Sequence, residues 1–185
     1  MRAPRYDVPK AAPQPLRLVQ QLVNTTDHEH GREWLGSPVE LERWLRDLGL
    51  PAGKVNESDV RRARELREAL RELLIANNTG TETGGPALAV LNEAAMRARL
   101  GIEFGRSAVA VIPHNGGVDG ALGRILAAAA TAVLDGSWER LKACRNCEWA
   151  FYDFSRNRSA TWCSMQLCGN RLKTRTYRRR RARHG

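Results

Sequence analysis

Four cysteines, the whole cysteine content of the chain, lie between positions 144 and 168. Two residues separate Cys144 from Cys147, four separate Cys163 from Cys168, and fifteen residues lie between the two pairs. Zinc binds four thiolates in a tetrahedron, and a two-residue spacing lets a tight turn direct both sulfurs at one point. The spacing therefore predicts one structural zinc ion. Four protein ligands leave no open position on the metal, so its expected role is folding and not catalysis.

Two other interpretations of the cysteines fit less well. A Cys-x-x-Cys pair can be a redox motif, but that motif stands in a βαβ fold with a single pair, and neither feature is visible here. Two disulfides would require an oxidising compartment. Arg2 and Arg5 are not followed by the apolar run of a secretory signal, so we expect a cytoplasmic protein with free thiols.

The segment that follows the cysteines is strongly basic. Eight of the residues from position 171 to the end are Lys or Arg and none is acidic, in a chain of net charge +10. On a helix, Arg171, Arg175 and Arg178 would share one face. Arginine pairs bidentately with phosphate or with guanine, so we expect this segment to bind nucleic acid. The candidate contact residues are Asn170, Arg171, Lys173, Arg175, Arg178, Arg179, Arg180 and Arg181.

Several alternatives for the basic segment stay open. Runs of like charge are often solvated tails, and one or two arginines could neutralise a zinc tetrathiolate. Acidic lipid or acidic protein surfaces would also attract such a segment. Readers of single-stranded RNA usually interleave aromatic and basic residues, whereas here the aromatic residues precede the basic run. Duplex DNA is therefore favoured over RNA.

The rest of the chain predicts a mainly α-helical domain with one β-hairpin. Residues 1–15, with four prolines, are expected to form a disordered leader, residues 16–135 the helical domain, and residues 138–185 the zinc module. Ser37, Pro38 and Glu40 give three helix-start signals together. Helices are expected at 16–23, 37–49, 58–80, 87–98 and 122–134, and the hairpin at 102–104 and 108–112.

The zinc module is too small to fold on its apolar residues alone. Residues 149–152 and 160–162 are expected to be the two strands of a hairpin that returns the second cysteine pair to the first. Cys163 is expected to precede a helix that carries Cys168 in its first turns. That arrangement resembles a treble-clef zinc site, continued by a C-terminal basic helix.

Few other features of the helical domain suggest chemistry. Asn24, Thr25 and Asp27 could line a ligand pocket, although these residue types also favour helix ends. Arg67 lies among acidic residues and is expected to form weak surface ion pairs. No nucleophile with a base, phosphate loop or carboxylate pair is evident, so an enzyme is not expected. The longest apolar stretch, 125–134, has ten residues, about half of a membrane span.

Several motifs together resemble two known families. The C-terminal part is similar to the CGNR zinc finger, and the N-terminal part resembles the ABATE domain, its usual partner. The C-terminal motifs are Cys144-x2-Cys147, Phe151-x-Asp153-x-Ser155, Trp162-Cys163-Ser164-Met165 and Cys168-Gly169-Asn170-Arg171. The N-terminal ones are Leu22-Val23-Asn24-Thr25, Trp44-Leu45 and Leu66-Arg67-Glu68-Ala69-Leu70. The resemblance implies a bacterial stress-induced transcription regulator whose four cysteines bind zinc.

The sequence thus supports one leading hypothesis and two rivals. The leading hypothesis is a zinc-dependent transcription regulator in which the N-terminal domain senses a small-molecule effector or forms a homodimer. The first rival is an RNA-binding or ribosome-associated module. The second is an enzyme with a small-molecule pocket in the N-terminal domain, for which the basic segment is only an anchor.

Overall fold

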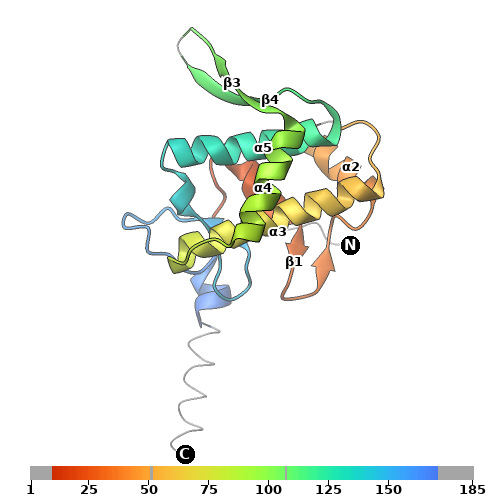
Figure 1. Cartoon of the computed structure of the whole chain (residues 1–185). Coiled ribbons are helices and arrows are strands. Elements are labelled where there is room, and N and C mark those ends of the chain that lie inside the picture. The colour runs from red at the N-terminus through yellow and green to blue at the C-terminus, as the bar shows by residue number, and fades with distance from the viewer. Residues whose placement is uncertain (1–9, 51, 107, 171–185) are drawn as a thin grey trace, which may run out of the picture.

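A computed structural model describes residues 10–50, 52–106 and 108–170 of the chain. The helices are α1 (Arg17–Val23), α2 (Pro38–Asp47), α3 (Glu57–Thr79), α4 (Gly85–Ala98) and α5 (Gly117–Leu134), with short helices η1 (Trp138–Arg140) and η2 (Met165–Gly169). The strands are β1 (Thr26–Asp27), β2 (Arg32–Glu33), β3 (Leu100–Phe104), β4 (Val109–Pro113), β5 (Leu141–Ala143) and β6 (Ala150–Tyr152). They pair as three antiparallel two-stranded hairpins, so the mainly α-helical prediction is confirmed (Figure 1).

Local capping signals set the starts of the two central helices. The Ser37 side chain accepts a hydrogen bond from the Glu40 backbone N–H at the start of α2, as the sequence predicts. The 23-residue helix α3 begins slightly earlier than expected, because its cap is Asn56 and not Ser58. Asn56 accepts from the backbone of Ser58 and Asp59, and Asp59 accepts from the Asn56 N–H at 2.9 Å. Gly80, with φ of +75°, ends α3.

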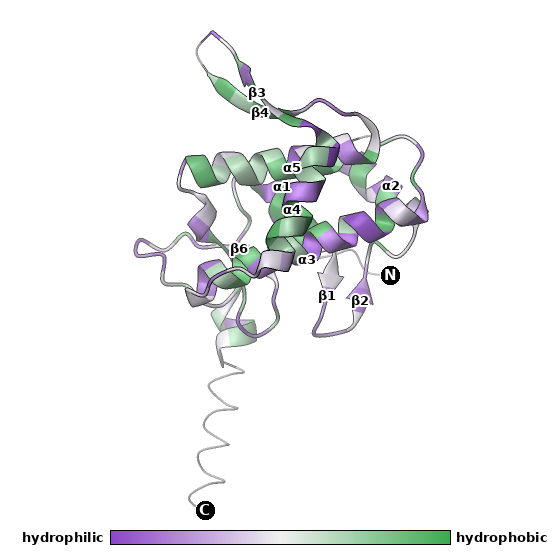
Figure 2. Cartoon of the chain, viewed as in Figure 1, coloured by the Kyte–Doolittle hydropathy of each residue, from purple (hydrophilic) through white to green (hydrophobic). Residues whose placement is uncertain are grey.

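Helix α5 is the most apolar helix of the core (Figure 2). It begins at Gly117, five residues before the predicted start. Residues 117–121 therefore form the first turn of the helix and not a loop before it. A Cβ on Gly123 would lie 2.5 Å from Cβ of Ala98 and 2.9 Å from Cβ of Pro113, so glycine lets α4 and β4 approach α5 closely. By length and composition α5 could span a membrane, but 61% of it is buried inside the protein, as in a core helix.

The β3–β4 hairpin confirms the prediction of a hairpin in this region. Its five pairs run from Leu100–Pro113 at the base to Phe104–Val109 near the turn. The hairpin projects from one end of the molecule, beyond α5, while the region of η2 lies at the other end (Figure 1). Its base packs on α5 and its outer half extends away from the helices.

The third hairpin joins the zinc module to the helical domain through a common core. Leu141, Ala143, Ala150 and Tyr152, from β5 and β6, belong to the same buried cluster as the residues of α1, α3 and α5. A second, smaller cluster contains the four cysteines and Phe151. The β5–β6 hairpin therefore contributes to both clusters: Leu141, Ala143, Ala150 and Tyr152 complete the core of the helical domain, and Phe151 packs in the smaller cluster with the cysteines.

Two predictions about local structure are wrong. Strand β6 pairs with β5 and not with residues 160–162, which form no strand. Residues 10–15, assigned from sequence to a disordered leader, pack on the body: Ala12 is buried, and the Lys10 carbonyl accepts from the Tyr152 N–H at 2.9 Å. Proline content signalled an irregular backbone there, but an irregular backbone can still be ordered by neighbouring strands.

Candidate metal centre

The first cysteine pair lies in the turn that joins β5 to β6. Cys144 follows β5, and its backbone N–H donates to the Trp149 carbonyl at 2.9 Å. The Glu148 N–H donates back to the Cys144 carbonyl at 2.9 Å, and Glu148 has a φ of +60°. These two bonds close the turn tightly. Cys144 and Cys147 therefore present their sulfurs on the same side of the hairpin.

The second pair is positioned by η2. The Ser164 side chain caps this helix by accepting from the Leu167 N–H at 3.3 Å, and the Ser164 carbonyl accepts from the N–H of Cys168 at 2.9 Å. Cys163 precedes the helix and Cys168 lies within it, as the sequence predicts. A Cβ on Gly169 would lie 2.7 Å from Sδ of Met165 and 3.3 Å from Cδ1 of Trp162, so this position is closely packed.

The four sulfurs have the arrangement that zinc requires. The Sγ atoms all lie within 4.8 Å of one another, with separations of 3.7 Å for Cys147–Cys163, 3.6 Å for Cys163–Cys168 and 3.5 Å for Cys147–Cys168. A tetrahedral zinc with bonds of 2.3 Å places its sulfurs about 3.8 Å apart. A disulfide would need about 2.05 Å. All four cysteines are buried, so the site is closed to a substrate.

The mutual influence of the four thiols on their pKa values also favours a bound cation. Hydrogen bonds from the thiols of Cys147 and Cys163 lower the pKa of Cys144. Its thiolate in turn raises the pKa values of Cys147 and Cys163, and burial raises the pKa of Cys168. Four adjacent thiols cannot all ionise without a compensating positive charge, because like charges repel strongly in a buried site. A divalent zinc ion supplies that charge when bound.

A buried ion pair braces the loop between β6 and the second cysteine pair. Oδ2 of Asp153 accepts from Nζ of Lys142 at 3.0 Å and from the Ala160 N–H at 2.8 Å, while Oδ1 accepts from the Ser155 N–H at 2.9 Å. Lys142 also donates to the Arg158 carbonyl at 2.5 Å. Burial would raise the pKa of Asp153, but the hydrogen bonds from Ser155 and Lys142 prevail and lower it to about 2.

Side chains of helix α3 bind both the β5–β6 turn and the loop that leads to the second cysteine pair. Nδ2 of Asn78 donates to the carbonyls of Ala143 at 2.6 Å and Thr161 at 3.0 Å, so one amide connects both halves of the zinc module. About two turns earlier on α3, Arg71 donates to the Glu148 carbonyl at 2.7 Å. These side chains satisfy backbone carbonyls that the short strands leave without partners.

Helix α1 contributes the other half of this polar contact. The Asn24 side chain donates to the Ala150 carbonyl at 3.0 Å and accepts from the Ala150 N–H at 2.7 Å, as an additional strand would. Gln20 donates to the same carbonyl at 3.1 Å. We call the set formed by Gln20, Asn24, Arg71 and Asn78 the polar seam. It fixes the cysteine-bearing hairpin to the helical domain.

The structure places the predicted pocket residues against other parts of the protein. Asn24 caps the end of α1 and binds Ala150, Thr25 donates to the Leu22 carbonyl at 2.7 Å, and Asp27 contacts Nδ1 of His30 at 2.8 Å. These contacts favour a structural role for the three residues at the end of α1 over a role in a ligand pocket. One open cleft among the described residues lies elsewhere, between α1, β4 and α5.

The prediction for Arg67 is wrong. Its side chain is buried and donates to both carboxylate oxygens of Glu33, at 2.7 and 2.8 Å, and to Glu68 at 2.7 Å. Burial would raise the pKa of Glu33, but the hydrogen bond and charge of Arg67 lower it overall. The charged pattern around Arg67 suggested an exposed helix face, whereas the β1–β2 hairpin covers that face.

The predicted nucleic-acid contacts lie mostly beyond the described residues. Asn170 is described: it is exposed and caps the C-terminal end of η2, two residues after Cys168. The remaining candidates, from Arg171 to Arg181, lie outside the described residues. Among the functional residues that sequence reasoning missed, Asp153 and Ser155 had a signal in the Phe-x-Asp-x-Ser motif, but Lys142 and Asn78 had none.

Comparison with known families now decides the assignment. The ABATE model, described as "Putative stress-induced transcription regulator", matches residues 16–137. The chain belongs to the ABATE family. The CGNR zinc finger model matches residues 140–181, and with the sulfur geometry this confirms one structural zinc ion as the cofactor of this ABATE protein. A search of curated proteins found no match.

Proposed function

We propose that this ABATE protein is a zinc-dependent nucleic-acid-binding protein of bacteria that regulates transcription, with DNA as the preferred partner. The main support for this proposal is that the basic segment follows the metal site directly in the sequence. The chain leaves the zinc-bound helix η2 at Asn170 and enters the run of eight Lys and Arg residues immediately afterwards. A rigid metal site thus sets where this charge begins.

The distribution of charge supports a polyanionic partner. Residues 138–170 contain five Lys or Arg and three acidic residues, and residues 171–185 contain eight Lys or Arg and no acid. Together they account for the entire net charge of +10, so residues 1–137 are neutral overall. A regulator that binds DNA through one module concentrates its charge in this way, because phosphate neutralisation supplies most of the affinity.

The mechanism follows from the order of contacts. Zinc ties the β5–β6 turn to η2, the Lys142–Asp153 pair braces the loop between them, and the polar seam fixes both to the helical domain. In the proposed complex, arginines after Asn170 bind phosphates and base edges. The N-terminal domain then senses an effector or joins two copies, and a cytoplasmic location keeps the thiols reduced.

A binding experiment tests the proposal. The zinc-loaded protein should bind a labelled 30-base-pair duplex with a log–log salt slope near about −5 if six phosphates are neutralised. Replacing Arg178, Arg179, Arg180 and Arg181 by Ala should weaken binding at least tenfold and, if each contacts one phosphate, flatten that slope by about 3.6 units. The matched control replaces four exposed arginines of α2–α4, Arg43, Arg46, Arg61 and Arg97, and should bind normally. Equal losses in both variants would refute a specific role for the C-terminal segment.

The choice between DNA and RNA needs a competition at fixed salt. We expect duplex DNA to displace labelled duplex at lower concentration than single-stranded RNA does. Selection from random duplexes should then enrich a defined sequence. Tighter binding of RNA would favour the ribosome-associated alternative, and no enrichment would reduce the function to nonspecific binding. Neither matched family is enzymatic, and the zinc ligands are all sulfurs, so we propose no catalytic role.

A further inference from the structure

The β3–β4 hairpin has an apolar face that the other described residues leave uncovered. Side chains alternate along a strand, so the cross-strand pairs Ile102–Val111 and Phe104–Val109 lie on one face of the ribbon. Ile102, Phe104 and Val109 are 63%, 81% and 60% exposed. A contiguous apolar surface on a projecting ribbon marks an interaction site, since an isolated two-stranded hairpin gains little stability by itself.

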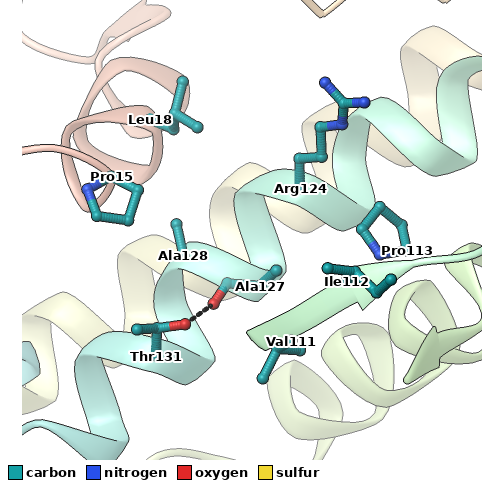
Figure 3. Close-up of a pocket in the computed structure, with 9 residues that line it drawn as sticks. All are labelled: Pro15, Leu18, Val111, Ile112, Pro113, Arg124, Ala127, Ala128 and Thr131. Atoms are coloured by element: carbon teal, nitrogen blue, oxygen red, sulfur yellow. Dashed lines mark hydrogen bonds between the residues drawn. The ribbon is translucent and has the colours of Figure 1, made fainter. Parts of the chain in front are cut away.

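An open apolar cleft begins at the base of the same hairpin. It has a volume of about 510 Å³ and lies between β4, α5 and α1 (Figure 3). Its walls are Pro15, Leu18, Val111, Ile112, Pro113, Ala127 and Ala128, with Arg124 and Thr131 as its polar residues. Arg124 and Thr131 are exposed, so the cleft is open along its length and would leave a small ligand largely in solvent.

We propose that two copies of this chain form a twofold dimer in which the β3–β4 hairpin of each copy lies in the β4–α5–α1 cleft of the other. Each copy carries both halves of the contact, a projecting apolar ribbon and an apolar cleft. A twofold axis therefore satisfies both at once and closes the assembly at two copies. The reciprocal contact doubles the area that one hairpin alone would bury, toward the size of a stable interface.

The charges of these surfaces favour a second copy as the partner. The hairpin carries Glu103 and Arg106 and has no net charge, whereas the net charge of +10 comes from residue 138 onward, and η2 of that part lies at the opposite end of the molecule from the hairpin (Figure 1). Two copies can therefore approach through their hairpins with the least repulsion. Among the described residues, Glu103 and Arg124 have no ion-pair partner, and each could find one across the axis.

The dimer leaves both zinc modules free at its outer ends. This arrangement fits the proposed regulator, because a twofold protein matches a palindromic site on DNA. The inference does not depend on DNA binding, however. It is tested without nucleic acid, so its failure and the failure of the proposed function are separate results.

The experiment is sedimentation velocity of the full-length, zinc-loaded chain over a series of concentrations. The wild type should sediment with about twice the chain mass of 20.7 kDa. Phe104→Glu on the hairpin and Thr131→Glu in the cleft should each raise the dimer dissociation constant at least 50-fold. Both side chains are exposed in the single chain, so neither change should unfold it. Val39→Glu, at a 63% exposed apolar residue of α2, is the matched control and should remain dimeric.

Three results would overturn the inference. The first is a wild type that stays monomeric at all concentrations, which would exclude a second copy as the occupant of the cleft. The second is a dimer that Phe104→Glu and Thr131→Glu leave intact. The third is a dimer broken by Phe104→Glu alone, because that pattern indicates hairpins packed on each other outside the clefts.

Discussion

The Asp153 carboxylate illustrates how much of the zinc module depends on single side chains. It is fully buried and binds Lys142 together with two backbone N–H groups of the loop 153–160. This loop leads to Cys163, so its shape decides where the second cysteine pair lies. A buried ammonium and a buried carboxylate stabilise the fold only as long as both are present.

Replacing Asp153 by Asn should therefore destabilise the protein strongly. The change leaves the Lys142 ammonium buried without its counter-charge, and such changes cost about 3–5 kcal/mol in the free energy of unfolding. Urea denaturation of the zinc-loaded protein measures this loss. The control is Glu139→Gln, which removes an exposed pair with Arg158 and should cost less than about 1 kcal/mol. Similar losses in the two variants would show that the Asp153 pair is not structural.

The Glu33–Arg67 pair predicts a pH dependence with a definite sign. The pKa of Glu33 in the folded protein is below its ordinary value of 4.5. The stabilisation is therefore complete above the unfolded-state pKa and is lost as the pH falls through the folded-state pKa. Glu33→Gln should lower the free energy of unfolding by roughly 1.5–3 kcal/mol at pH 7, as for a hydrogen bond to a charged group. The difference from wild type should shrink below about pH 4.5.

Urea denaturation of both proteins from pH 7 to pH 3 tests this dependence, and comparing the two removes effects on the metal that they share. The exposed Glu42→Gln variant should show almost no difference at any pH. A difference for Glu33→Gln that grows toward acid pH would contradict the assigned sign.

At the scale of elements, the polar seam connects α1 and α3 to the cysteine-bearing hairpin. Asn24→Ala leaves the buried N–H of Ala150 without its partner and removes one of the two side-chain donors to the Ala150 carbonyl, at a cost of about 1–3 kcal/mol. Because Ala150 begins β6 only three residues after Cys147, the apparent zinc affinity should fall as well. Competition with a chelator measures it. Asn115→Ala, which removes one exposed bond to the Arg97 carbonyl, should change neither quantity appreciably.

Local signals made the helices predictable, and long-range contacts made the rest unpredictable. Short sequence patterns predict the Ser37 cap, the glycine that ends α3 and the pairing of the cysteines. The structure agrees with each of them. By contrast, Lys142 and Arg67 look like solvent-exposed charges in the sequence. Their burial is decided by partners at Asp153 and Glu33.

The pairing of β6 shows the same limit for an element. Residues 160–162 and 149–152 had suitable strand composition, so a hairpin between them was a reasonable expectation. Strand β5, with the sequence Leu-Lys-Ala, gave little signal, and its Lys142 would not be expected inside a core. It becomes a strand because α3 packs against it and provides a buried surface for Leu141 and Ala143.

At the scale of the whole molecule, one core spans the helical domain and the zinc module. Leu141, Ala150 and Tyr152 are buried in one cluster with residues of α1 and α3. Helix α1 lies more than a hundred residues before them in the sequence. Heating the zinc-loaded protein should therefore give one cooperative transition. Tryptophan fluorescence, far-ultraviolet circular dichroism and zinc release to an indicator dye should share a midpoint within about 2 °C. Zinc release well below the main transition would show that the two parts unfold independently.

Four sulfurs share one zinc ion, and the proposed function requires that this ion positions the module through which we propose that the protein binds nucleic acid. The most direct measurement is the metal content of the purified protein, followed by chelation with parallel readouts of DNA affinity and of amide protection in residues 138–170. We predict one zinc per chain, and loss of both protection and affinity after chelation. Protein without zinc, or chelation that leaves both readouts unchanged, would contradict the account.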